Sequence, residues 1–320
     1  MNKFGFSYRQ EAYDELLEGT RRLIKWKQKE VLHEFLCCDV SVIGMKDNVR
    51  VVVRRRISGT SSYIHSDYTV NLMMGFVAKS FDEPKENDGV WEIKFDTIPN
   101  NDKDLREIHD VKIWSENKEE LQIFYEMLKN NQNIMPEESN VFLTNYEQND
   151  KLIPVIYQPV IDSWKNFLRE IHVRELPDKF NYEVTLIFND ESLREHFIVD
   201  VFYRFLRLFR YKRTKDIETF FIHVEKDKNY FTFPNIYSDC NTIYHDTIHG
   251  DKCRPYPKHE VKYYFQNKSH PIIFINTSNH SMAEHDNNHD FWKWEYIPWS
   301  KKMPIILGDK PRKIIDDKYK

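Results

Sequence analysis

Glycine scarcity is the sequence feature that most limits the folds open to this chain. Of its 320 residues only 8 are glycine, and none lies between Gly89 and Gly250. Loops that wrap phosphate groups rely on glycine, because the backbone must approach the ligand closely or adopt positive φ. The patterns GxGxxG, GxxxxGKS, GxxxxGKT and GxSxG are all absent. A Rossmann dinucleotide fold, a P-loop NTPase and an α/β-hydrolase are therefore disfavoured.

The composition predicts a folded chain with a sizeable core. Hydrophobic residues make up 40% and aromatic residues 15%, which is too apolar for a disordered chain. Charged residues make up 31%, but their signs nearly cancel and leave a net charge of −4. Overall charge therefore favours neither a histone-like DNA binder nor an acidic mimic of DNA, and a nucleic-acid role needs a local basic patch.

The sequence predicts a cytoplasmic protein that does not contact a membrane. Residues 1–36 are charged almost throughout and lack the apolar centre of a signal peptide. No window reaches the roughly 18 to 20 apolar residues of a membrane-spanning helix. Cys37 and Cys38 are adjacent, and only Cys240 and Cys253 have a spacing suited to pairing, so the cysteines do not form a secreted disulfide framework.

The N-terminal part is expected to combine helices and strands. Apolar residues at roughly helical spacing predict one long amphipathic helix over residues 8–36. Strands are expected at 40–44, 48–58, 90–96 and 109–114. A second helix is expected over 117–130, because one apolar stripe follows helical spacing there: Leu121, Phe124, Tyr125 and Leu128.

The segment 130–151 is rich in Asn, Gln and Glu and is the best candidate for a linker. It divides the chain into an N-terminal α+β domain, 1–135, and a C-terminal α+β domain, 152–320. A single intertwined domain is the alternative.

The C-terminal part predicts a β-α-β unit followed by more strands. A strand at 181–189, a helix at 190–213 and a return strand at 217–226 form the unit, with Asn189 or Asp190 as the helix cap. Further strands are expected at 259–266, 270–278, 291–298 and 303–308. This mixture predicts an α+β fold with mixed sheets, a long N-terminal helix and the β-α-β unit, rather than regular α/β winding.

Glu260 and Lys262 form a Glu-x-Lys pattern on a predicted strand. Restriction-type nucleases hold a divalent cation with an Asp and a Glu, while a nearby Lys polarises the attacking water. Alternation along a strand places Glu260 and Lys262 on one face, and Asp251 lies upstream across a polar turn. These residues are candidates for a catalytic Mg²⁺ or Mn²⁺ site. The alternative is an ordinary solvent-facing pair of opposite charges.

Cys240, His245, His249 and Cys253 follow a C-x4-H-x3-H-x3-C spacing. Zinc prefers four such ligands in a tetrahedron, and histidines four residues apart can face together. A structural zinc site in this segment is therefore one hypothesis, and a surface loop with two reduced thiols is the other.

The polar run that begins after Ile275 includes His280 and His285, which are candidates to border the catalytic site. Side chains at the carboxyl end of a rigid strand are well placed for binding or catalysis. The alternative is a tight turn in which Asn and Asp bond to the backbone. Trp292, Trp294 and Tyr296 follow at strand spacing, and they predict either a core face or a stacking platform for a base.

The helix at 190–213 carries a basic face that is a candidate for nucleic-acid contact. Arg204, Arg207 and Arg210 lie opposite three phenylalanines, and Lys212 and Arg213 extend the charge. Several cations in so short a stretch can contact successive phosphates. The alternative is the ordinary charged face of an exposed helix.

Together these patterns favour a nucleic-acid-directed protein, with a metal-dependent nuclease in the C-terminal half as the enzyme hypothesis. Two alternatives stay open: a non-catalytic subunit of a multi-protein assembly that binds a protein partner, and a sensor that binds a nucleotide on the Trp face.

Overall fold

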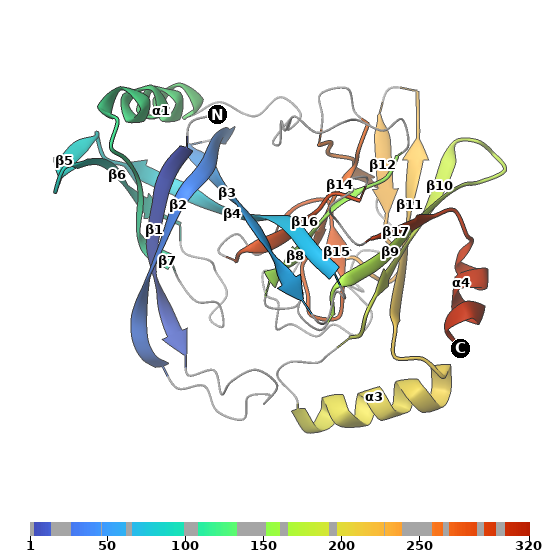
Figure 1. The fold of residues 1–320 in the computed structure, drawn as a ribbon. Coiled ribbons are helices and arrows are strands. Elements are labelled where there is room, and N and C mark those ends of the chain that lie inside the picture. The colour runs from blue at the N-terminus through green and yellow to red at the C-terminus, as the bar shows by residue number, and fades with distance from the viewer. Residues whose placement is uncertain are drawn as a thin grey trace.

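Among the residues that the structure describes, the protein is mostly β: 56% of these residues are strand, in two mixed sheets of 11 and 6 strands, and three short helices accompany them. The computed structural model (Figure 1) describes residues 3–13, 27–45, 47–61, 66–98, 108–132, 152–160, 166–191, 197–226, 228–238, 258–264, 269–286, 291–298 and 305–320. The expectation of mixed sheets is confirmed. The described residues contain more strand and less helix than the predicted α+β fold.

The predicted long N-terminal helix is wrong. Strands β1 (Lys3–Tyr13) and β2 (Lys27–Met45) form an antiparallel pair in its place. Along β1, Phe4, Phe6 and Tyr8 alternate into the core with strand period. Phe6 is paired in register with Phe35 of β2, and their rings stack with centroids 6.4 Å apart. Cross-strand contact of this kind outweighs the helical spacing that part of the segment also fits.

The larger sheet draws its strands from both ends of the chain. Its order is β15-β14-β8-β16-β4-β3-β2-β1-β7-β6-β5. The remaining strands are β3 (Asn48–Ser61), β4 (Ser66–Phe81), β5 (Lys85–Asn87), β6 (Val90–Thr97), β7 (Ile108–Ser115), β8 (Val155–Pro159), β14 (Ile272–Ile275), β15 (Met282–Ala283) and β16 (Lys293–Tyr296). Because β16 pairs with both β4 and β8, one sheet joins segments on either side of 130–151. The division into two domains stays a prediction.

The smaller sheet has the order β13-β12-β11-β10-β9-β17. Its strands are β9 (Leu168–Glu175), β10 (Asn181–Phe188), β11 (Asp216–Val224), β12 (Asn229–Thr232), β13 (His259–Glu260) and β17 (Ile306–Gly308). Helix α3 (Phe197–Tyr211) connects β10 to β11. The expected strand-helix-strand order is present, but β10 and β11 are antiparallel neighbours and not a parallel crossover pair.

The two largest hydrophobic cores among the described residues hold the sheets and helix α1 (Lys118–Asn131) together. One packs the smaller sheet against β8, β14 and β16, and includes Leu186, Phe220, Ile273 and Trp294. The other lies among β1 to β4, β6 and β7 under helix α1. The predicted stripe of α1 is confirmed, because all four of its residues are buried, and the Asn117 side chain caps the helix by accepting from the backbone N–H of Glu119 and Glu120.

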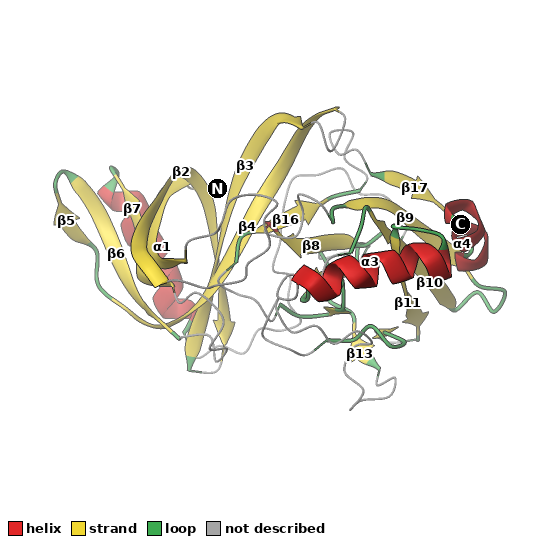
Figure 2. Cartoon of the chain, turned by 90° about the horizontal axis from the view of Figure 1, so that it is seen from below, coloured by secondary structure: helices red, strands yellow, loops and turns green. Residues whose placement is uncertain are grey.

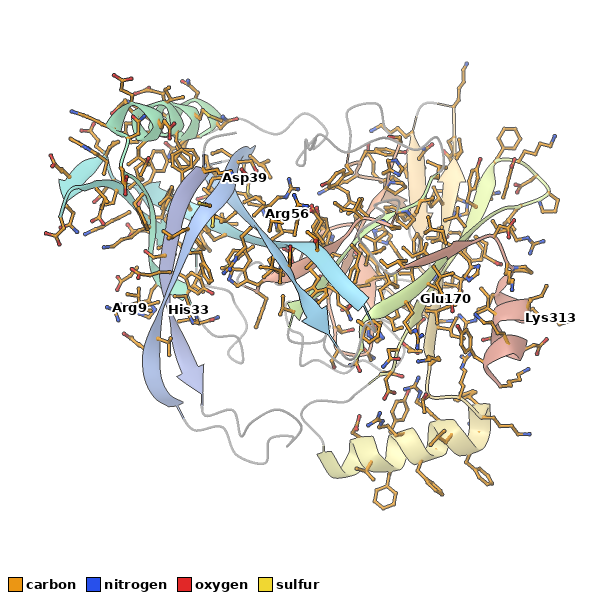
Figure 3. The ribbon with its side chains drawn as sticks, viewed as in Figure 1. Arg9, His33, Asp39, Arg56, Glu170 and Lys313 are labelled. Atoms are coloured by element: carbon orange, nitrogen blue, oxygen red, sulfur yellow. The ribbon has the colours of Figure 1, made fainter. Side chains whose placement is uncertain are left out.

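Helices α3 and α4 lie on the outside of the smaller sheet. Helix α4 (Arg312–Tyr319) packs Ile315 against Ile187 and Ile217. It also places the Lys318 ammonium 2.9 Å from Oε1 of Glu170 on β9, which Figure 3 labels beside the helix. Helix α3 runs along the lower edge of the molecule in Figure 1, and it crosses in front of the smaller sheet when seen from below (Figure 2). Among the described residues, no helix has the length and apolar character needed to cross a membrane.

Candidate functional site

Helix α3 turns its polar side toward the protein and its apolar side toward solvent. Asp200 is 0% exposed and Arg207 is 5% exposed, whereas Phe205 and Phe209 are 68% and 80% exposed. Side chains project from the side of α3 that faces away from the strands (Figure 3). This orientation is the reverse of the usual one, in which an amphipathic helix buries its apolar stripe.

The buried side of α3 is held by an ion-pair cluster, which we call the Arg207 cluster: Asp190, Glu191, Arg204, Arg207, Asp216 and His280. Nη1 of Arg207 lies 3.2 Å from Oε2 of Glu191 and 3.6 Å from Oδ1 of Asp190. Nη2 lies 3.7 Å from Oδ1 of Asp216 and donates a 3.0 Å hydrogen bond to the carbonyl of Thr214. One guanidinium therefore serves three carboxylates in a site from which water is largely excluded.

The topology of the smaller sheet explains why these acids converge. Asp190 and Glu191 follow the end of β10, and Asp216 opens β11, where it is paired in register with Phe188. Adjacent antiparallel strands end and begin at the same sheet edge, so the three carboxylates meet there. Helix α3 connects the two strands and carries Arg207 back over that edge.

His280 joins the Arg207 cluster from the larger sheet. Its Nδ1 lies 2.8 Å from Oδ2 of Asp216, and its ring stacks on Phe188 with centroids 3.8 Å apart and planes at 5°. Burial raises the pKa of the Asp216 carboxyl, but the hydrogen bond and charge of His280, with the charge of Arg207, outweigh burial and lower it. The pair thus resembles the Asp–His arrangement that orients a general base. However, His280 is 0% exposed, so this conformation gives a substrate no access to Nε2.

The turn that carries His280 is a buried, internally bonded loop. The backbone N–H of His280 donates to the carbonyl of Thr277, and the backbone N–H of Ser281 donates to Oγ1 of Thr277 at 2.9 Å. Asn276 donates through Nδ2 to the carbonyls of Ser238 and His285. These contacts agree with the interpretation of this segment as a tight turn, in which polar side chains form hydrogen bonds with backbone N–H and carbonyl groups.

Glu260, on β13 (His259–Glu260), and Lys262, two residues further on, are both exposed. Glu260 forms a surface ion pair with Lys228, at 3.1 Å between Nζ and Oε1. Burial and the charge of Arg50 lower the pKa of Lys262, while Glu284 and Glu260 oppose that shift. The Lys262 ammonium therefore interacts electrostatically with the carboxylates of both glutamates.

His285 is joined to Glu284 rather than to the Arg207 cluster. Nδ1 of His285 lies 3.0 Å from Oε1 of Glu284, and Nδ1 of His259 lies 3.3 Å from Oε2 of the same carboxylate. Burial raises the pKa of Glu284, but hydrogen bonds from His259 and His285 outweigh it and lower the pKa. The structure thus gives His280 and His285, predicted as neighbours in one site, different carboxylate partners.

The predicted metal ligands lie outside the described residues. These are Cys240, His245, His249 and Cys253 for zinc, and Asp251 for a catalytic cation, so both metal sites stay predictions. Within the described ranges, no group of three or more His, Cys, Asp or Glu side chains is arranged to hold a metal ion.

The five cations predicted to bind nucleic acid are divided between ion pairs and solvent. Arg204 pairs with Asp190, and Arg213 pairs with Asp316. Arg207 is buried in its cluster, while Arg210 and Lys212 are exposed. Contact with phosphates stays a prediction, and the ion pairs leave fewer of these charges for it.

A second buried ionic network, the β16 network, links Lys293 and Glu295 of β16 to Arg50, Arg54 and Asp286, and no sequence pattern predicts it. Oδ2 of Asp286 lies 2.9 Å from both Nη2 of Arg50 and Nζ of Lys293, and Asp286 and Lys293 are 0% exposed at the side chain. Two residues on, Oε1 of Glu295 lies 3.1 Å from Nη2 of Arg54. All four residues of β16 are buried, although charged residues that alternate with aromatics along a strand usually face solvent.

The three aromatics of this stretch do not share one environment. Trp294 and Tyr296 lie in the core under the smaller sheet. Trp292 packs against the other core and donates its indole N–H to the Tyr8 hydroxyl at 3.0 Å. The core interpretation of Trp294 and Tyr296 is therefore the one that the packing supports.

Comparisons of this chain with protein-family models, curated proteins and solved structures find no match.

Proposed function

We propose that this protein is a non-catalytic subunit of a protein assembly, and that α3 is the element that binds its partner. The observation that carries the proposal is the orientation of α3, which buries charge and exposes apolar side chains. Soluble proteins rarely present a contiguous apolar patch of this size unless it meets a partner.

The outward face of α3 is an apolar arc of six residues without a charged side chain, each 48% to 80% exposed: Val201, Phe202, Phe205, Leu206, Leu208 and Phe209. Side chains of this size and exposure present on the order of 700 Å². That area is close to the roughly 800 Å² that each partner contributes to an interface of standard size. A single helix can therefore supply one side of a specific interface.

The Arg207 cluster keeps the apolar arc exposed. If α3 rolled about its axis to bury Phe205 and Phe209, the charge of Arg207 would move away from the buried carboxylates of Glu191 and Asp216. Breaking a buried ion pair on one side costs about 3–5 kcal/mol. A partner can cover the arc without that cost, so covering from outside is favoured over internal rearrangement.

The variant Phe205→Asp tests this proposal. We expect it to bind the partner at least about 30-fold more weakly, since central aromatic anchors contribute 2 kcal/mol or more. Its free energy of unfolding should change by no more than about 0.5 kcal/mol, because the side chain is 68% exposed.

Quantitative affinity purification, with the bound proteins identified by mass spectrometry and the affinity then measured with purified partner, provides the comparison. Arg210→Asp is the matched control on the same helix and should retain the partner. Equal binding by the wild type and Phe205→Asp contradicts the proposal.

The metal-dependent nuclease is a second candidate, favoured by one observation: the lowered pKa of Lys262 beside Glu260 and Glu284. A lysine poised in this way suits the polarisation of an attacking water. In this account Lys262→Ala lowers cleavage of DNA or RNA by about 100-fold or more with Mg²⁺ or Mn²⁺, and EDTA stops cleavage. Lys258→Ala, which removes an exposed lysine paired with Glu225, is the control. Nucleic acid that stays intact with both metals eliminates this candidate.

A further inference from the structure

We infer that the partner that covers α3 is a second copy of this chain, with the two α3 helices packed antiparallel across a twofold axis. The inference rests on the proposed function, because it names the partner of the same surface. Four properties of the apolar arc carry it: its composition, its shape, the charges at its end and its area.

The composition of the arc matches that of an interface between identical subunits. Such interfaces are more apolar than transient ones and are depleted of charged residues. All six side chains of the arc are apolar, and the exposed Arg210 lies beside the arc at the C-terminal end of α3. A twofold axis also brings the same patch together with itself, so the patch must be self-complementary. A patch of one chemical kind meets that condition.

The shape of the arc suits a second helix. α3 runs along the lower edge of the molecule in Figure 1 and lies in front of the smaller sheet in Figure 2, so it presents a convex ridge at the surface. The row Val201, Phe205 and Phe209 has a spacing of four residues, and Phe202 and Leu206 form a parallel row. Rows at this spacing on one helix pack into the grooves between the same rows on another.

The charges at the end of α3 select the antiparallel arrangement. Arg210 and Lys212 are exposed at its C-terminal end. Parallel pairing would place these cations of the two copies side by side, whereas antiparallel pairing puts them at opposite ends of the interface. Antiparallel pairing also opposes the two helix dipoles.

The area of the arc suits a stable pair. Two arcs of about 700 Å² present roughly 1,400 Å² in total, and burial of most of that area reaches the lower part of the range of about 1,200–2,000 Å² for specific interfaces.

Sedimentation equilibrium of the full chain tests the inference. At roughly 50 µM, above the micromolar end of affinities for interfaces of this size, we expect twice the subunit mass of 39.0 kDa. Phe205→Asp should raise the dissociation constant by about 100-fold or more. Phe180→Asp is the matched control, because Phe180 is 65% exposed on the turn between β9 and β10 and should leave the dimer intact.

Cysteine cross-linking tests the antiparallel register. Phe205 lies near the middle of α3, so Phe205→Cys should form a disulfide with its own copy under mild oxidation. Val201→Cys and Phe209→Cys should cross-link with each other in a mixture and poorly with themselves. Wild-type protein controls for Cys37, which is exposed. Efficient self-linking at all three positions would indicate parallel helices and overturn the arrangement.

The failure of this inference is distinguishable from that of the proposed function. A monomeric mass at roughly 50 µM, or a dimer that Phe205→Asp leaves unchanged, overturns the second copy as partner. If Phe205→Asp then still weakens binding of a different protein, the proposed function stands. Binding of the wild type, but not Phe205→Asp, to vesicles containing phosphatidylserine would overturn both the second copy and the protein partner. The arc would then bind a lipid surface.

Discussion

Replacement of Arg207 by methionine is expected to lower the free energy of unfolding by about 3–5 kcal/mol. Methionine keeps much of the volume but removes the guanidinium that serves Asp190, Glu191 and Asp216. The carboxylates then stay buried without that counter-charge, and the cost of an uncompensated buried charge exceeds what the ion pairs gained.

Urea unfolding of the wild type and Arg207→Met at equal protein concentration measures this effect, since self-association makes stability concentration-dependent. Arg210→Met is the matched control on the same helix. Arg210 is exposed, so its replacement should change stability by no more than about 0.5 kcal/mol. A loss below about 1 kcal/mol for Arg207→Met would contradict the buried cluster.

The second large effect is expected for Asp286→Asn, which should also cost about 3–5 kcal/mol. Asp286 is fully buried between Arg50 and Lys293, and the Lys293 side chain is fully buried as well. Asparagine keeps the shape of the side chain but removes the charge that both cations share. Two cations then remain in the sheet interior, where desolvation is costly.

Thermal and urea unfolding check this prediction against Glu260→Gln. Glu260 pairs with Lys228 at the surface, where both side chains are almost half exposed, 45% and 46%. A surface pair contributes about 0–1 kcal/mol, so the control should stay near the wild type. Equal losses for Asp286→Asn and Glu260→Gln would show that the β16 network carries no more weight than a solvent-exposed pair.

The parts of the fold that the sequence predicts are those where local signals agree with tertiary packing. Helix α1 has a cap at Asn117 and an apolar stripe, and both appear in the structure. At the N-terminus the local signal is ambiguous, because apolar residues fit two periods at once. The choice there depends on partners far along the chain, such as Phe35 opposite Phe6, which no local pattern contains.

The orientation of α3 could not be predicted from its amphipathic pattern. The pattern locates two faces correctly but does not say which one faces the protein. Glu191 and Asp216 decide the matter, because they lie at one sheet edge and attract Arg207. That edge is defined only after β10 and β11 pair. The acids that flank the helix in sequence, Asp190 before it and Asp216 after it, are the one available signal.

Sequence patterns point to some members of the Arg207 cluster and not to others. They single out Arg207 and His280 for separate reasons, and the structure joins both to Asp216, to which no pattern points. No sequence pattern points to Lys293 and Glu295, because charged residues within a strand usually face solvent. Only the packing over both faces of β16, whose four residues are all buried, shows that neither face of the strand is open.

The most direct test of the reversed orientation of α3 is a double-mutant cycle between Arg207 and Glu191. The free energy of unfolding is measured for the wild type, Arg207→Met, Glu191→Gln and the double variant. Contact between the two side chains predicts a coupling energy of about 1–3 kcal/mol. Additive effects, within about 0.5 kcal/mol, would mean that Arg207 does not meet Glu191 and that α3 turns its charged side to solvent.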